Sequence, residues 1–180
     1  MLQITLPAIE QWDEVKQEFI QTKGQTLQLE HSLVSLSKWE SKWNKPFLTK
    51  EPKTQEETID YIKCMTINQN VDPNVYNVLT SKHFSMINDY IEAPMTATTF
   101  NNMNQNKSSR EIITSELIYY WMIALQIPFE CQKWHLNRLL TLVRVCNIKN
   151  SPPQKMSKKA TASQYAQLNA ARRQRMNTKG

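Results

Sequence analysis

Apolar and polar residues alternate in two short segments near the N-terminus. Leu2, Ile4 and Leu6 are each separated by one residue, and the same period returns over residues 27–33. A β-strand points successive side chains to opposite faces, so a period of two is typical of a strand with one buried face. We therefore expect these two segments to form a small β ribbon.

A helical period lies between the two expected strands. Trp12, Val15 and Phe19 are three or four residues apart, which would place them on one side of a helix. Acidic residues accompany them, mainly toward the start, where the helix dipole favours negative charge. The pattern predicts a short amphipathic helix that ends before Gly24.

Two further helices are predicted over residues 35–43 and 54–65. Pro46 follows the first and should stop it, because proline cannot continue a helix. Thr54 and Glu57 form a capping box at the start of the second, in which each side chain binds a free backbone amide. The residues expected on the buried faces are Leu36, Trp39, Trp43, Ile59, Ile62 and Met65.

The next two helices are each expected to begin at a capping residue. Asp72 with Pro73 can open one, since Asp caps helices and Pro is tolerated at the first helical position. Ser81 can cap the other, which must end before Pro94. The residues expected to face inward are Val75, Val78, Leu79, Phe84, Ile87, Tyr90 and Ile91.

The most apolar part of the chain follows a polar segment, residues 101–107, that should form an exposed loop. Ser108 and Glu111 suggest a second capping box, opening a helix that continues to Leu125. Beyond Pro128, a further helix is predicted over about 129–146. We expect these two helices to supply the centre of the core through Ile112, Leu117, Trp121, Leu125, Trp134, Leu139 and Val143.

Taken together, these patterns predict a mainly α protein. A chain of 180 residues is long enough for one well-packed domain and an extension. We expect a single compact helical domain with an N-terminal β ribbon over residues 1–148. The basic C-terminal extension, residues 149–180, should be a helix or a disordered tail. No apolar run is long enough to cross a bilayer.

Positive charge is concentrated at the C-terminal end. Residues 144–180 contain nine Lys or Arg and no Asp or Glu, whereas residues 1–143 contain 13 basic and 16 acidic residues. Residues 157–176 are good helix formers, and Tyr165, Leu168 and Arg172 would share one helical face. Such a helix is marginal alone and is stabilised on contact. The expected binding residues are Lys155, Lys158, Lys159, Tyr165, Leu168, Arg172, Arg173 and Arg175.

The charge alone leaves the partner of this extension open. Lysines and arginines can neutralise nucleic-acid phosphates, dock on an acidic protein, or only keep the chain soluble. Single-stranded nucleic acid is usually bound with the help of several aromatic residues, and only Tyr165 lies in this segment. We therefore favour a protein partner over nucleic acid.

The sequence shows no pattern that predicts catalysis or a cofactor. Glycine occurs only as Gly24 and Gly180, so phosphate-cradling loops and dinucleotide fingerprints cannot be built. Cys131 and His135 would share a helical face and could bind zinc, but the sequence offers no two further ligands nearby. Three cysteines without a disulfide or zinc-ribbon spacing indicate reduced thiols in a cytosolic compartment. We expect no enzyme, no metal and no cofactor.

Several segments resemble a family of small proteins of tailed bacteriophages. They are LEHSLVSLSKWESKW at 29–43, TIDYIKCM at 58–65, DPNVY at 72–76, WHLNRLL at 134–140, LNAARR at 168–173 and TKG at 178–180. The family is that of tail assembly chaperones. The resemblance implies binding to tape-measure and tail tube proteins during tail morphogenesis in the host cytoplasm, and it leaves a homo-oligomer as one option.

Two other functions remain open at the level of sequence. One is a DNA-binding packaging protein similar to a small terminase subunit, which would use the basic extension on DNA. The other is a structural virion protein at the tail or the head-to-tail junction. The chaperone is favoured because the chain combines a helical body, a separate basic extension and no catalytic pattern.

Overall fold

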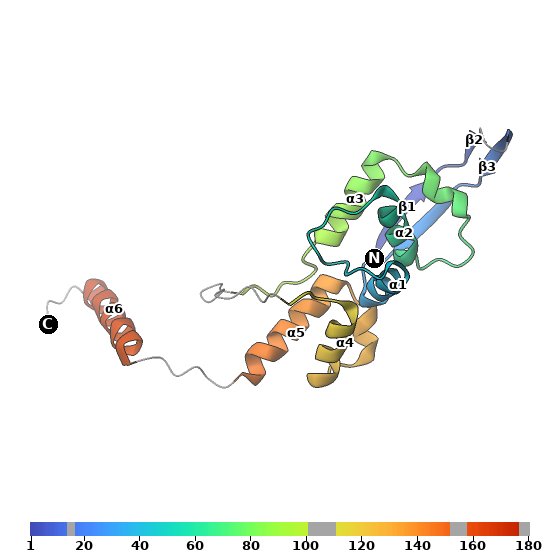
Figure 1. Ribbon diagram of the computed structural model, residues 1–180. Coiled ribbons are helices and arrows are strands. Elements are labelled where there is room, and N and C mark those ends of the chain that lie inside the picture. Colours follow the sequence, from blue (N-terminus) through green and yellow to red (C-terminus); the bar gives the residue numbers. More distant parts are fainter. Residues whose placement is uncertain (14–16, 101–110, 152–157, 177–180) are drawn as a thin grey trace. The chain divides into compact units, whose positions relative to one another are not determined.

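The computed structural model describes residues 1–13, 17–100, 111–151 and 158–176. The chain divides into two compact units, Met1–Asn147 and Ile148–Gly180. The first unit is mainly helical with antiparallel strands at its N-terminal end, as the sequence predicts (Figure 1). Among the described residues, no helix has the length and apolar character needed to cross a membrane.

The predicted N-terminal ribbon is present. β1 (Leu2–Leu6) pairs antiparallel with β4 (Gln25–Leu29), in a register that places Leu2 opposite Leu29. The alternating apolar residues of both strands are buried, except for the half-buried Leu2. On the exposed face, the hydroxyls of Thr5 and Thr26 lie 3.1 Å apart. The second strand ends at Leu29, earlier than the predicted residue 33, because Ser32 already caps the following helix.

The prediction of an amphipathic helix between these strands is wrong. The segment forms a second antiparallel pair, β2 (Ile9–Asp13) with β3 (Glu18–Thr22), in which Trp12 lies opposite Phe19. Phe19 is 65% exposed, and a short helix is marginal in water unless it buries an apolar face. Gln17 adopts a left-handed φ of 53° just before β3, in the connection between the two strands.

The two helices predicted next are confirmed. α1 (Leu33–Trp43) begins at the Ser32 cap and ends at Asn44, whose left-handed φ of 51° stops the helix before Pro46. α2 (Gln55–Met65) begins at the predicted capping box, since Thr54 and Glu57 exchange side-chain to backbone hydrogen bonds. Segment 65–67 then runs beside the end of β4, with hydrogen bonds from Glu30 N to Met65 O and from Ile67 N to Gln28 O, both 2.9 Å.

The middle helices also follow the sequence, with two differences. η1 (Pro73–Val78) starts after the Asp72 cap, as predicted, but it is a 3₁₀ rather than an α-helix. α3 (Ser81–Glu92) is preceded by Thr80 as its cap, one residue before the predicted Ser81, and it ends before Pro94. Val75, Val78, Ile87 and Tyr90 are buried as expected.

The helix predicted to start at Ser108 begins later. α4 (Ser115–Ala124) is capped by Thr114, and residues 111–114 are not helical. Ser108 and the predicted loop at 101–107 lie outside the described residues. Because Ile112 precedes the helix, it is 60% exposed instead of part of the core.

The helix predicted over 129–146 is divided into two parts. η2 (Phe129–Lys133) is a 3₁₀ helix, and α5 (Leu136–Asn150) follows after a break. The break is held by an isolated bridge between Ser32 and His135 and by a 2.7 Å hydrogen bond from Leu136 N to His31 O. Cys131 and His135 therefore do not share a helix, and the prediction that they lie on one helical face is wrong.

The core lies where α1 meets α2, α4 and η2, and α3 packs beside β1. Of its predicted centre, Leu139 and Val143 are buried, whereas Trp121, Leu125 and Trp134 are half-buried residues packed against the core. Leu117 is also only half-buried. α4 is rotated relative to the prediction, so that Ile118 and Met122 are its fully buried apolar residues.

The second unit contains α6 (Lys158–Met176), a basic helix, which is one of the two forms predicted for the extension. Every residue from 162 to 176 is exposed. The helix has no acidic residue in its first turn, and Arg173 and Arg175 lie in its last turn, where positive charge complements the helix dipole.

Candidate protein-docking surfaces

α4 carries apolar residues on nearly all sides. Ile118 and Met122 face the core and are fully buried, whereas Tyr120 and Ile123 on the other side are 63% and 62% exposed. A helix that is apolar all round is normally buried all round. The exposed side of α4 is therefore a candidate surface for a partner.

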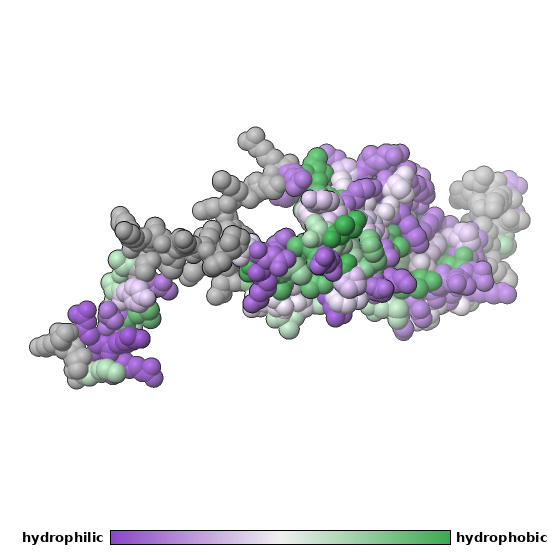
Figure 2. All heavy atoms as spheres, turned by 90° about the horizontal axis from the view of Figure 1, so that it is seen from below, coloured by the Kyte–Doolittle hydropathy of each residue, from purple (hydrophilic) through white to green (hydrophobic). Residues whose placement is uncertain are grey.

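Exposed apolar residues continue on both sides of this helix. Ile112 and Ile113 precede α4 and Phe129 follows it, and all three are exposed. Glutamates accompany them, since Glu111 adjoins Ile112, Glu116 lies one turn before Tyr120, and Glu130 adjoins Phe129. We call this set the α4 surface: Glu111, Ile112, Ile113, Glu116, Tyr120, Ile123, Phe129 and Glu130. Figure 2 shows hydrophobic side chains at the surface on this side of the body.

A buried carboxylate holds the start of α4 in place. Glu40 of α1 is buried, and its two oxygens accept hydrogen bonds from Ser115 N at 2.7 Å and Phe47 N at 2.8 Å. Thr114 also caps the helix, since its hydroxyl accepts from Leu117 N. The exposed face of α4 is thus presented by a helix whose first turn is fixed to α1.

Glu116 on the α4 surface is ionised at neutral pH. Its own backbone amide and the hydroxyls of Thr114 and Ser115 donate hydrogen bonds to it, which lowers the pKa of its carboxyl. Glu116 therefore contributes a negative charge beside the exposed Tyr120.

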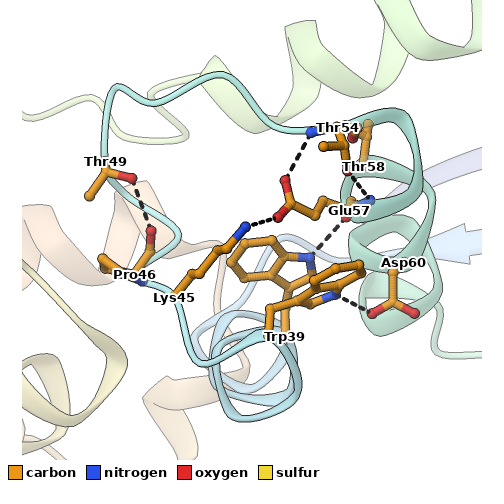
Figure 3. Close-up of polar contacts among 9 residues, drawn as sticks. Trp39, Lys45, Pro46, Thr49, Thr54, Glu57, Thr58 and Asp60 are labelled. Carbon is orange, nitrogen blue, oxygen red and sulfur yellow. Dashed lines mark hydrogen bonds and ion pairs between the residues drawn. The ribbon is translucent and has the colours of Figure 1, made fainter.

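The α1 helix that carries Glu40 is itself clamped to α2 (Figure 3). The indole of Trp39 donates to the backbone oxygen of Glu57 at 2.9 Å, and the indole of Trp43 donates to the Asp60 carboxylate at 3.0 Å. Lys45 pairs with the Glu57 carboxylate at 2.6 Å, and Lys42 pairs with Asp60. The contact with Lys45, together with the Thr54 amide, lowers the pKa of the Glu57 carboxyl.

The predicted binding residues of the extension lie mostly on α6. Tyr165, Leu168 and Arg172 share one face, which continues to Met176, and helical geometry places Arg173 and Arg175 on either side of that face. All of these side chains are exposed. Lys158 and Lys159 are the first residues of the helix, and Lys155 lies outside the described residues.

A cavity of about 350 Å³ opens between α1, the end of α2 and η2. Its lining includes Val34, Lys38, Cys64, Ile67 and Lys133. Burial, and then the nearby Asp60 carboxylate, raise the pKa of Cys64. The thiol therefore stays protonated at neutral pH, which is the opposite of what a cysteine nucleophile requires.

A chain of buried polar side chains leads to Glu30, which also lines this cavity. His31 Nδ1 lies 2.6 Å from the Tyr61 hydroxyl, the rings of His31 and His135 are 5.1 Å apart, and His135 Nε2 lies 3.0 Å from Tyr90 O. The Tyr90 hydroxyl donates to Glu30 at 2.6 Å. Each group thus has a partner within the fold, so the cluster joins β4, α2, α3 and the start of α5.

Both histidines of this cluster are neutral at pH 7. Burial lowers the pKa of His31 to about 3, and the nearby His135 acts in the same direction. Burial also lowers the pKa of His135. Within the described part of the chain, no three His, Cys, Asp or Glu residues lie together as a group that could hold a metal ion.

No protein-family model, curated protein or solved structure matches this chain. Function is therefore inferred from its residues and their arrangement, together with the resemblance noted in the sequence. Sequence reasoning identified the basic residues of α6 but missed the α4 surface. The sequence did contain a signal for this surface. Residues 117–125, which belong to α4 and its C-terminal cap, are apolar on nearly all sides, and contact with the core can bury only one of these sides.

Proposed function

We propose that this protein is a tail assembly chaperone of a tailed bacteriophage, which binds tape-measure and tail tube proteins in the host cytoplasm during morphogenesis. The observation that carries the proposal is the exposed apolar side of α4, where Tyr120 and Ile123 are more than half exposed. Contiguous exposed apolar side chains on a folded protein commonly mark a protein-binding site. The resemblance of the sequence to these chaperones supplies the identity of the partners.

The α4 surface suits an apolar, helical client. Tyr120 and Ile123 are one turn apart, so an amphipathic helix can lie against them with residues at its own three- and four-residue spacing. Phe129 and Ile112 extend the contact beyond the ends of α4. A tape-measure protein that is long, helical and not yet assembled would offer such faces.

α6 provides a second, charged contact. It holds five Lys or Arg residues and no acidic one, so it can pair with carboxylates of the client. Exposed ion pairs contribute at most about 1 kcal/mol each, so the apolar contacts of α4 should supply most of the affinity and α6 should favour acidic clients. Neither contact requires a cofactor or a covalent step.

Co-expression with the tape-measure protein of the same genome tests the proposal. We expect the tape-measure protein to become soluble and to co-purify with the full chain. The variant Tyr120→Ser/Ile123→Ser should lose this effect, and Met86→Ser, which changes an exposed apolar residue on α3, should retain it. A tape-measure protein that remains insoluble and unbound with the unaltered chain would overturn the proposal.

A nucleic-acid partner is the second candidate, because α6 is positively charged and fully exposed from residue 162 onward. Binding through several phosphates would weaken steeply when salt is raised from about 50 to about 200 mM. A chain that shows no DNA or RNA binding at the lower salt concentration would exclude this function.

A further inference from the structure

Acidic and basic residues are separated between the two units of this chain. All 16 Asp and Glu residues lie in the first unit, residues 1–147, which also holds 14 of the 22 Lys and Arg residues. The second unit, residues 148–180, holds the other eight basic residues and no acidic one. The first unit therefore carries a net negative charge and the second a net positive charge.

α6 has the features of a helix that requires a partner. Tyr165, Leu168 and Met176 form an apolar stripe along it, and all three are exposed. Isolated helices are marginal in water, and their stability in proteins comes mostly from packing of an apolar face. Helical geometry places the small residues Ala162 and Ala171 next to the stripe, where they allow a close approach by another helix.

The α4 surface is complementary to this stripe. It offers apolar side chains at Tyr120 and Ile123. Glu116 lies one turn before Tyr120, and Glu130 follows α4 at the start of η2. On α6, Arg172 lies within the stripe and Arg173 and Arg175 flank it. The apolar residues of the two helices can therefore meet while the arginines reach the glutamates.

We propose that the chain self-associates by placing α6 of one copy on the α4 surface of a second copy. The apolar side of α4 is exposed within the first unit, and the α6 stripe is exposed within the second. If each copy places its α6 on the α4 surface of the other, both α6 stripes and both α4 surfaces are covered. Such a reciprocal exchange is a common route to symmetric dimers. The assembly does not depend on the proposed function, although a client would compete with α6 for the α4 surface.

Sedimentation analysis of the full chain with charge-reversed variants tests the inference. At low salt and up to about 100 µM, we expect the unaltered chain to form dimers or larger assemblies. Glu116→Lys/Glu130→Lys places positive charge on both surfaces, and Arg172→Glu/Arg173→Glu places negative charge on both. Each variant alone should associate at least about tenfold more weakly, because like charges then face each other.

Mixing these two variants in equal amounts should restore association. In the mixed pair, α6 of the first variant meets the α4 surface of the second, and both of these surfaces keep their original charge. The other two surfaces both have reversed charge and are also complementary, so both contacts are available again. Asp89→Lys/Glu92→Lys, which reverses exposed charges on α3, is the matched control and should associate like the unaltered chain. The single variant Glu130→Lys leaves the first turn of α4 intact and should weaken association in the same direction.

Three results would overturn the inference. They are a full chain that is monomeric at the highest concentration, association that neither charge reversal weakens, and a mixture of the two variants that remains monomeric. The last result would show that association does not pair α6 of one copy with the α4 surface of another. Loss of tape-measure binding with intact self-association would instead contradict only the proposed function.

Discussion

At the scale of single residues, Glu40 connects three parts of the first unit. Its carboxylate is buried and accepts from the backbone amides of Phe47 and Ser115, which lie in the segment after α1 and at the start of α4. A charged acceptor of two buried amides contributes more than an ordinary hydrogen bond. The orientation of α4, and with it the α4 surface, depends on this one side chain.

The Glu40→Ala variant should therefore lose substantial stability. Two backbone amides would be left without an acceptor, and each costs about 1 to 3 kcal/mol when buried. We expect the free energy of unfolding, measured by urea denaturation, to fall by about 2 to 4 kcal/mol. Glu92→Ala, at an exposed position of α3, should change it by less than about 0.5 kcal/mol. Equal effects of the two substitutions would show that Glu40 does not have this role.

Buried His31 should make the protein less stable in mild acid. Its pKa is lowered to about 3 in the folded state by burial and by His135, from an ordinary value of 6.5. Below about pH 6.5 the unfolded chain binds a proton that the folded chain does not, so the contribution of His31 is fully present above that pH and is lost as the pH falls. We expect the free energy of unfolding to fall by on the order of 2 kcal/mol between about pH 6.5 and about pH 4.5.

Urea denaturation across this range, compared with a His31→Gln variant, measures the effect. The variant cannot take up that proton, so its stability should depend less on pH, while His135, whose pKa is also lowered, leaves a smaller slope. Glu57 and Asp60 have lowered carboxyl pKa values, so their contributions to the free energy of unfolding are lost only at still lower pH. Identical pH profiles for the variant and the unaltered chain would contradict the assignment to His31.

At the scale of secondary-structure elements, the two sides of α4 should respond differently to substitution. Ile118→Ala removes a fully buried side chain and should lower the free energy of unfolding by about 2 to 4 kcal/mol. Ile123→Ser changes a side chain that is 62% exposed and should alter it by less than about 1 kcal/mol. A large loss for Ile123→Ser would mean that this side of α4 is needed for folding rather than for a partner.

α6 should be separable from the stability of the first unit. Ala166→Pro places a proline in the middle of the helix, which costs about 3 kcal/mol or more and should abolish it. We expect a loss of far-UV circular dichroism from the helix with no change in the melting temperature of the first unit measured by near-UV signal. A lowered melting temperature in Ala166→Pro but not in Ala166→Ser would show that α6 supports that unit.

The elements that sequence predicted well are those defined by local contacts. The Thr54 and Glu57 side chains cap α2 within one turn, so a short stretch of sequence contains the whole signal. The spacing of seven residues between Trp12 and Phe19 led to the wrong prediction of a helix. This spacing fits two helical turns, but it also fits two positions that face each other across a hairpin. The start of α4 at Ser115 was missed because its amide binds Glu40, 75 residues earlier.

The candidate site was predictable only in part for the same reason. Arg172, Arg173 and Arg175 were proposed from charge and composition, which need no tertiary contact. Ile123 was not found, because exposure depends on which side of α4 faces the core. Ile112 was assigned to the core because the helix was expected to begin before it, and it is exposed.

At the scale of the whole molecule, an acidic helical unit with an exposed apolar helix precedes a unit with a basic, fully exposed helix. Apolar contacts tolerate salt, whereas contacts of the arginines are screened by it. A client held mainly by α4 should therefore remain bound at a salt concentration that abolishes contacts of α6. This difference separates a protein-binding chaperone from a nucleic-acid-binding protein.

The most direct test of the central claim is the amount of tape-measure protein that co-purifies with this chain at high salt. We predict stoichiometric recovery with the unaltered chain and with Met86→Ser, and a loss of at least about tenfold in affinity with Tyr120→Ser/Ile123→Ser. Equal recovery with and without the α4 substitutions, or no recovery with the unaltered chain, would contradict the claim that the α4 surface binds the client.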